Sequence, residues 1–123
     1  MTDSELARAL ERGELPNEGF HHRDHLRVGL VYLGEAPSVG DAVDRMASTL
    51  RRFAASVGKA EKYSQPLTEF WMYQLAAARA LAPGATADEL FRGCPQLLDK
   101  NLVLAYYSRD AAATGSTDTP RHP

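Results

Sequence analysis

Residues 38–58 read SVGDAVDRMASTLRRFAASVG, and this stretch decides the fold class. Its large apolar side chains recur at steps of three or four residues, the spacing of one face of an α-helix: Val39, Val43, Met46, Leu50, Phe53 and Val57. Ser38 is a favourable N-cap, Asp41 suits the first turn, and Gly58 suits the position just past the end. The pattern predicts a helix over residues 39–57.

Two further helices are predicted before this stretch. Thr2 and Glu5 have the spacing of a capping box and predict a helix over residues 3–12. A second helix is predicted from about residues 21–23 to 33, with leucines at helical spacing. Gly29 lies inside it, which indicates either close approach of a neighbouring helix or a position without structural consequence.

Helix signals continue toward the carboxyl end. Ser64 is a candidate cap for a helix that ends before Pro83, and Thr86 is the cap of a short helix that runs through Phe91. A restart at Pro95 is expected to carry apolar residues as far as Tyr106. Because alternating strand-like runs are absent, we predict an all-α fold, a compact bundle of five or six short helices. Residues 1–108 form its single domain, and residues 109–123, which are rich in small and polar residues, are expected to be a flexible tail.

Charge and composition exclude several classes of protein. The chain has 123 residues, and 14 basic against 16 acidic side chains give a net charge of −2. Basic residues alternate with acidic ones, so no nucleic-acid partner is expected. Apolar runs fall far short of the ~20 residues that span a bilayer, and the N-terminus lacks the pattern of a signal peptide. With Cys94 as the only cysteine, we expect a soluble, cytoplasmic protein without an intrachain disulfide or a membrane partner.

Three of the four histidines fall within five positions: His21, His22 and His25. At a helix start, His21 and His25 (i, i+4) or His22 and His25 (i, i+3) share a face, and such a pair can hold a first-row divalent metal with a third ligand from elsewhere. Without a metal, either imidazole is a candidate for acid–base catalysis. In the structural alternative, the histidines cap the helix or stack on aromatic rings such as Phe20 and Tyr32.

A second group of candidates gathers near the helix predicted to start at Ser64. Thr68 is a candidate donor or acceptor to a substrate, and Tyr63 and Ser64 are candidate contacts. Trp71 is either part of the core or a wall of a pocket, because it falls on the apolar stripe of its helix. Tyr107, at the end of the last predicted helix, is a further candidate for ligand binding.

Several short motifs carry a family resemblance: Leu15-Pro16, Phe20-His21-His22-Arg23-Asp24-His25-Leu26, Tyr32-Leu33, Arg52-Phe53-Ala54, Lys62-Tyr63, Thr68-Glu69-Phe70-Trp71, Leu97-Leu98-Asp99-Lys100 and Tyr106-Tyr107-Ser108. In order and spacing they resemble a family of small, largely uncharacterised all-helical bacterial proteins, over about residues 14–108. The resemblance implies the helical fold and a polar pocket between the helix that follows His21 and the helix that follows Ser64. It supplies no activity.

Two departures from the family pattern concern the pocket. Ser64 stands where the pattern has His, and Pro66 stands where it has the first Thr. If the family builds its site from these residues, this chain has lost part of it. The chain after Ser108 also lacks the apolar continuation of the pattern.

Our leading hypothesis is a small helical protein that binds or transforms a small molecule in a His-rich polar pocket. His21 or His25 would serve as acid, base or metal ligand, and Thr68 would contact the substrate. His22, Tyr63, Ser64, Trp71 and Tyr107 complete the predicted site. The alternative is a non-catalytic helical adaptor or homodimer whose histidines are structural, and the departures at Ser64 and Pro66 favour it somewhat.

Overall fold

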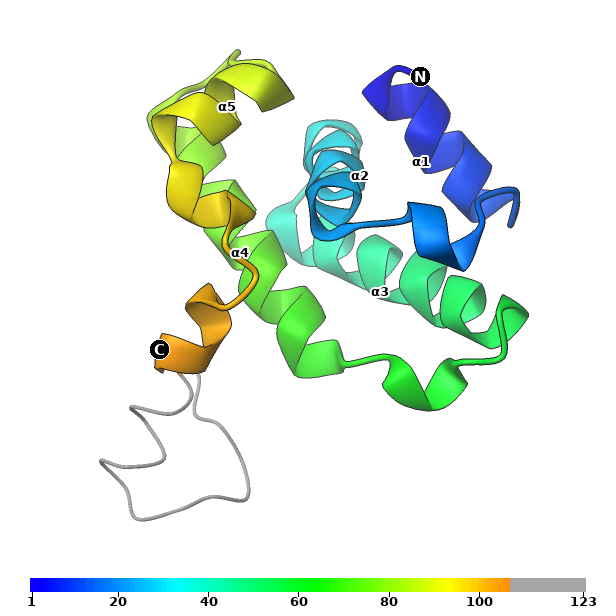
Figure 1. Ribbon diagram of the computed structural model, residues 1–123. Helices are drawn as coiled ribbons and strands as arrows, with labels where there is room; N and C mark the ends of the chain where they lie inside the picture. Colours follow the sequence, from blue (N-terminus) through cyan, green and yellow to red (C-terminus); the bar gives the residue numbers. More distant parts are fainter. Residues whose placement is uncertain (107–123) are drawn as a thin grey trace.

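Residues 1–106 are described by a computed structural model, and their regular structure consists of helices without a strand (Figure 1). The α-helices are α1 (Asp3–Glu11), α2 (His22–Glu35), α3 (Val39–Ser56), α4 (Gln65–Leu81) and α5 (Ala87–Gly93). Three short 3₁₀ helices join them: η1 (Asn17–Gly19), η2 (Ala60–Lys62) and η3 (Pro95–Leu98). The predicted all-α bundle is confirmed. Tyr107 and the predicted tail lie outside the described residues.

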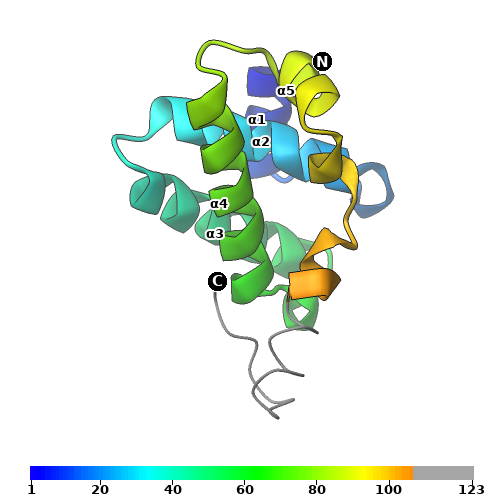
Figure 2. The ribbon, with the colours of Figure 1, turned by 90° about the vertical axis from the view of Figure 1, so that its left-hand side faces the viewer.

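The long helices α2, α3 and α4 pack against one another and form the centre of the molecule. Figure 1 shows α2 in the middle, with α1 on one side and α4 on the other. Seen from the side, α4 crosses in front of both α2 and α3 (Figure 2). The chain then returns through α5 and η3 along α4, where the rings of Phe70 and Tyr106 lie 5.3 Å apart.

Each predicted cap forms. Thr2 Oγ1 accepts from the backbone N–H of Glu5 at 3.1 Å, and the Glu5 carboxylate accepts from the N–H of Thr2 at 2.7 Å. Ser38 and Ser64 accept from the backbone of the first turns of α3 and α4 at 3.1 and 3.2 Å. Thr86 caps α5 in the same way as Thr2 caps α1. These bonds satisfy N–H groups that a helix start leaves without partners.

The last predicted helix is interrupted. It was expected to continue from Pro95 to Tyr106, but η3 ends at Leu98 and Asp99 has an extended backbone, with φ −90° and ψ 97°. The Asp99 carboxylate accepts from the backbone N–H of Asn101 at 3.0 Å, and a new helical segment covers residues 102–106. Short polar side chains that bond to nearby backbone compete with helix continuation in this way. The break places Lys100 in a turn.

The apolar faces of α1 to α5 share one core, and its fully buried large side chains include Leu10, Leu26, Tyr32, Met72, Leu75 and Leu97. Gly29 marks the contact between α2 and α4. A Cβ at this position would lie 2.8 Å from Leu75 Cδ1 and 3.0 Å from Met72 Sδ. The first explanation offered for this glycine, close approach of a neighbouring helix, is therefore confirmed.

Within residues 1–106, no helix combines the length and the apolar character that crossing a membrane requires.

Candidate functional site

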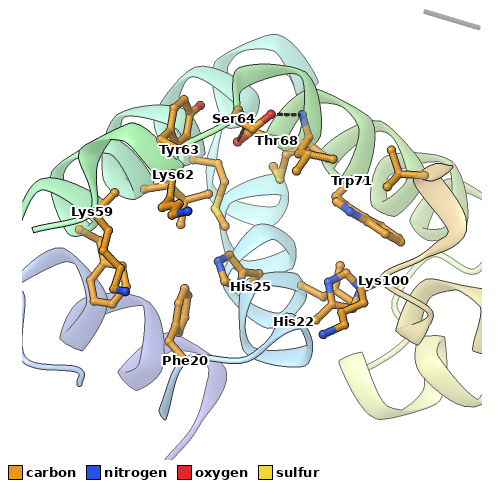
Figure 3. A pocket seen from close by; sticks show the side chains of 18 of the residues that line it. Phe20, His22, His25, Lys59, Lys62, Tyr63, Ser64, Thr68, Trp71 and Lys100 are labelled. Atoms are coloured by element: carbon orange, nitrogen blue, oxygen red, sulfur yellow. Dashed lines mark hydrogen bonds between the residues drawn. The ribbon is translucent and has the colours of Figure 1, made fainter. Parts of the chain in front are cut away.

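A cavity of about 600 Å³ lies between α2, α3 and α4 and is closed on one side by the segment after η3 (Figure 3). Most of the lining side chains are apolar, including Phe20, Leu26, Met46, Leu50, Phe53 and Met72. The polar lining includes His22, His25, Tyr63, Ser64, Thr68 and Asn101. The structure thus brings together most of the residues selected from the sequence, but in an apolar cavity with a few polar groups rather than in a polar pocket.

His25 is the histidine at the centre of this lining (Figure 3). Its Nδ1 donates to the backbone carbonyl of His21 at 3.0 Å, because a carbonyl oxygen can only accept. Its ring stacks at a tilt on Phe20, with 4.1 Å between centroids. Burial lowers the pKa of His25, and the nearby His22 lowers it further, against the opposing effects of the His21 carbonyl and Asp24. The imidazole is therefore neutral near pH 7, with the proton on Nδ1 and a lone pair on Nε2.

His22 serves a structural contact as well as the cavity. Its Nε2 donates to the backbone carbonyl of Leu97 at 2.8 Å, which ties the start of α2 to η3. Its ring also meets Trp71 edge-on at 4.5 Å between centroids. The Nε2–H of His22 is thus used within the fold and cannot donate to a ligand, although the ring lines the cavity.

His21 lies apart from the cavity. It is the exposed N-cap residue of α2, and its backbone N–H donates to Asp24 at 3.1 Å. The predicted metal pair of His21 and His25 also lacks further ligands. In the described part of the chain, no group of three His, Cys, Asp or Glu side chains is placed to hold a metal ion.

The polar groups at the start of α4 are largely bonded to the protein. Thr68 is buried and donates to the carbonyl of Ser64 at 3.0 Å, so its hydroxyl offers only acceptor capacity to a ligand. The Ser64 hydroxyl accepts from the helix backbone as a cap. The Tyr63 hydroxyl donates to Gln65 at 2.7 Å, and the guanidinium of Arg51 lies over the Tyr63 ring.

Trp71 is half-buried and forms one wall of the cavity. Its ring meets His22 on one side and Phe70 edge-on on another, at 5.1 Å between centroids. The sequence indicated either a core residue or a pocket wall, and Trp71 has both positions, since it packs in the bundle and also faces the cavity. It is the only tryptophan of the chain.

Sequence reasoning missed the contribution of lysine. Lys59, Lys62 and Lys100 all line the cavity. Figure 3 shows Lys59 and Lys62 on one side and Lys100 on the other. A compositional signal was present, because these are the only three lysines among 14 basic residues.

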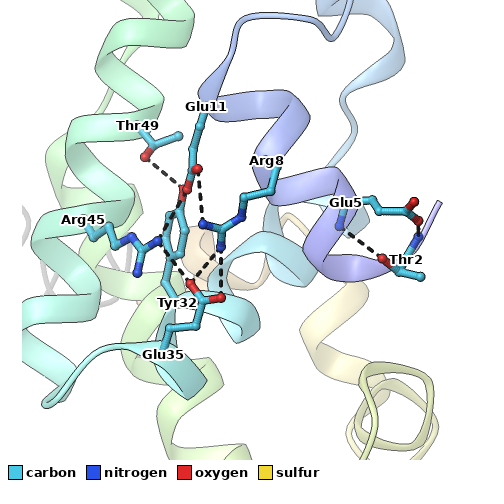
Figure 4. Close-up of polar contacts among 8 residues, drawn as sticks. All are labelled: Thr2, Glu5, Arg8, Glu11, Tyr32, Glu35, Arg45 and Thr49. Carbon is cyan, nitrogen blue, oxygen red and sulfur yellow. Dashed lines mark hydrogen bonds and ion pairs between the residues drawn. The ribbon is translucent and has the colours of Figure 1, made fainter.

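A polar cluster near the C-terminal end of α2 ties that helix to α1 and α3 (Figure 4). The hydroxyl of Tyr32, a fully buried residue, donates to Glu11 of α1 at 2.6 Å. Thr49 of α3 lies 3.0 Å from the same oxygen and is its donor, because the tyrosine proton is directed to Glu11. Arg45 lies over the Tyr32 ring at 4.4 Å and pairs with Glu35 at 3.1 Å. Burial and the Glu11 carboxylate raise the pKa of Tyr32 to about 12.

Comparison with family models, with curated proteins and with solved structures finds no match to this chain. The resemblance noted from the motifs therefore stays a prediction.

Proposed function

We propose that this protein binds a small organic molecule in the cavity between α2, α3 and α4. The observation that carries the proposal is the cavity itself, with its volume of about 600 Å³ and its mainly apolar walls. Ligand pockets of proteins have roughly 300–1,000 Å³ and combine apolar walls with a few convergent polar groups. This cavity has both properties.

His25 is the group best suited to orient a bound molecule. Its Nδ1–H is held by the His21 carbonyl, and no described residue hydrogen-bonds to Nε2. A neutral imidazole in this tautomer accepts a hydrogen bond from a ligand hydroxyl or amine. The same lone pair would serve as a general base if the protein transforms its ligand. The metal-assisted version has less support, because residues 1–106 supply no third ligand.

Trp71 provides a direct test, since it is the only tryptophan and lies in the cavity wall. We would titrate the protein with N-phenyl-1-naphthylamine, a neutral apolar dye that becomes fluorescent in apolar surroundings. We expect saturable binding with one dye per chain and energy transfer from Trp71 to the dye.

A pair of adjacent alanines supplies the matched variants. Ala54 lines the cavity, whereas Ala55 is exposed and does not. Ala54→Phe should fill part of the cavity and weaken dye binding at least tenfold, and Ala55→Phe should leave it unchanged. Circular dichroism would verify that both variants fold. Absence of dye binding by the wild-type protein, or equal binding by both variants, would contradict the proposal.

The rival function is an adaptor or homodimer in which a second protein covers this site. Leu67 and Leu104 favour it, because they line the cavity and remain 42% and 59% exposed. Sedimentation of the wild-type protein over a range of concentrations tests this alternative. A cytoplasmic location is part of the proposal in either case.

A further inference from the structure

Positive charge is distributed unevenly in this chain. All three of its lysines line the cavity, and none of the arginines within residues 1–106 does. No aspartate or glutamate is present in the described lining. Although the net charge of the chain is −2, the charged side chains in the described lining of this cavity are all lysines.

The lysines also differ from the arginines in their partners. The ion pairs within residues 1–106 are formed by Arg8, Arg12, Arg23, Arg27 and Arg45. Over the same residues, the ammonium groups of the lysines form neither an ion pair nor a hydrogen bond. The structural ion pairs therefore account for many arginines and for no lysine.

The backbone places the lysines at the opening of the cavity. Lys59 and Lys62 belong to the connection between α3 and α4, and Lys100 belongs to the turn that interrupts the last predicted helix. All three residues are exposed and still line the cavity, so they lie where it meets solvent. Low-dielectric walls concentrate the field of such charges in the hollow, which favours an anion. Lysine suits this place because its flexible stem carries three donors and no fixed geometry.

We infer that the ligand is an organic anion with an apolar body. The inference rests on the proposed function and specifies its ligand class. The apolar body lies against Phe53, Met72 and Trp71, and an acidic group, in the first instance a carboxylate, lies among the three ammonium groups. Charge complementarity distinguishes this occupant from an apolar helix of a partner protein, which would leave the lysines unused.

Two dyes with the same skeleton test the inference. 8-Anilino-1-naphthalenesulfonate carries a sulfonate on the skeleton of the neutral dye N-phenyl-1-naphthylamine. We would measure the affinity of both dyes for the wild-type protein and for a triple variant with Lys59→Gln, Lys62→Gln and Lys100→Gln. Because an exposed charge pair contributes a modest amount, each lysine is expected to contribute about threefold to affinity for the anionic dye. The triple variant should lose at least tenfold for that dye and bind the neutral dye as before.

The control variant removes the same charge elsewhere. Arg52, Arg79 and Arg92 are exposed and lie outside the cavity, so their joint replacement by Gln changes the net charge equally. This control should bind both dyes as the wild-type protein does. Decanoate should displace the anionic dye more effectively than decanol, since the two share a chain and differ in charge.

The outcomes separate the two proposals. Equal affinity of the triple variant and the control for the anionic dye would overturn the anion inference, while binding of the neutral dye would leave the proposed function intact. If neither dye binds the wild-type protein, both proposals are wrong. A dimer that dissociates as dye binds would identify a second copy of the chain as the natural occupant and overturn the inference as well.

Discussion

Replacing Tyr32 by Phe tests how α2 is held in the orientation that presents His22 and His25 to the cavity. Tyr32 is 0% exposed, and its hydroxyl joins α1 to α3 through Glu11 and Thr49 at 2.6 and 3.0 Å. The Tyr32→Phe substitution keeps the ring and removes only this oxygen. The polar link between the three helices is then lost without a change in apolar packing.

The expected loss follows from the two partners. A hydrogen bond to a charged group contributes roughly 1.5–3 kcal/mol to stability. The Glu11 side chain is 24% exposed and pairs with Arg8 and Arg45. Solvent and these two cations therefore compensate part of the hydrogen bond that Glu11 loses when the Tyr32 hydroxyl is removed. Thr49 is 2% exposed and loses the acceptor of its hydroxyl, which costs about 1 kcal/mol. We expect a total near 2 kcal/mol, or about 8 °C in Tm for a domain of this size.

Urea denaturation followed by circular dichroism measures this loss, and Thr49→Val completes a double-mutant cycle. If the two hydroxyls are coupled, the double variant should be less destabilised than the two single variants together, because replacing both buried partners removes an unsatisfied group. A Tyr32→Phe variant within 0.5 kcal/mol of the wild-type protein, about the limit of an ordinary surface substitution, would refute the reasoning.

Four further substitutions have expected outcomes. The pKa of His25 is lowered in the folded protein, so the unfolded chain takes up a proton first as pH falls below the ordinary value near 6.5, and the folded state loses stability there. His25→Gln removes this proton uptake. The variant should therefore lose less stability than the wild-type protein between pH 7 and 5 in denaturant titrations. Gly29→Ala should destabilise the protein by about 1–2 kcal/mol in the same assay, because the new methyl group overlaps Leu75. Gly34→Ala in the same helix has room for the methyl group and should stabilise the protein by about 0.5–1 kcal/mol. Removing the α4 cap with Ser64→Ala should cost about 1 kcal/mol in thermal unfolding, and no change would show that this cap is dispensable.

The local part of the fold could be predicted from the sequence because helix signals are local. Caps at Thr2, Ser38, Ser64 and Thr86 depend on side chains within three residues of the groups they satisfy. The helix break at Asp99 was missed for a related reason. The apolar spacing that continues through it suggested one helix, and the competing bond from the Asp99 side chain to the backbone does not appear in a hydrophobic pattern.

The composition of the site depended on contacts that no local pattern contains. His22 and Leu97 are 75 positions apart and are joined by a hydrogen bond, so this use of the imidazole follows only from the packing of η3 on α2. Likewise, Lys59 and Lys100 are distant in sequence and reach the same cavity because α4 and the returning chain bring their segments together. The sequence was sufficient to predict that the histidines lie at a helix start. The different surroundings of His21, His22 and His25 could be seen only in the tertiary structure.

The serine at position 64, which departs from the pattern of the predicted resemblance, has a structural role in this arrangement. Ser64 stands in place of an expected histidine, and its hydroxyl is bonded to the α4 backbone. Thr68 donates its hydroxyl proton to the Ser64 carbonyl, and the residues of α4 in the described lining carry neither an imidazole nor a carboxylate. The described part of α4 therefore places no imidazole across the cavity from His25. If the protein binds a small molecule as proposed, Nε2 of His25 would accept a hydrogen bond from it, and the three lysines at the opening would attract its acidic group.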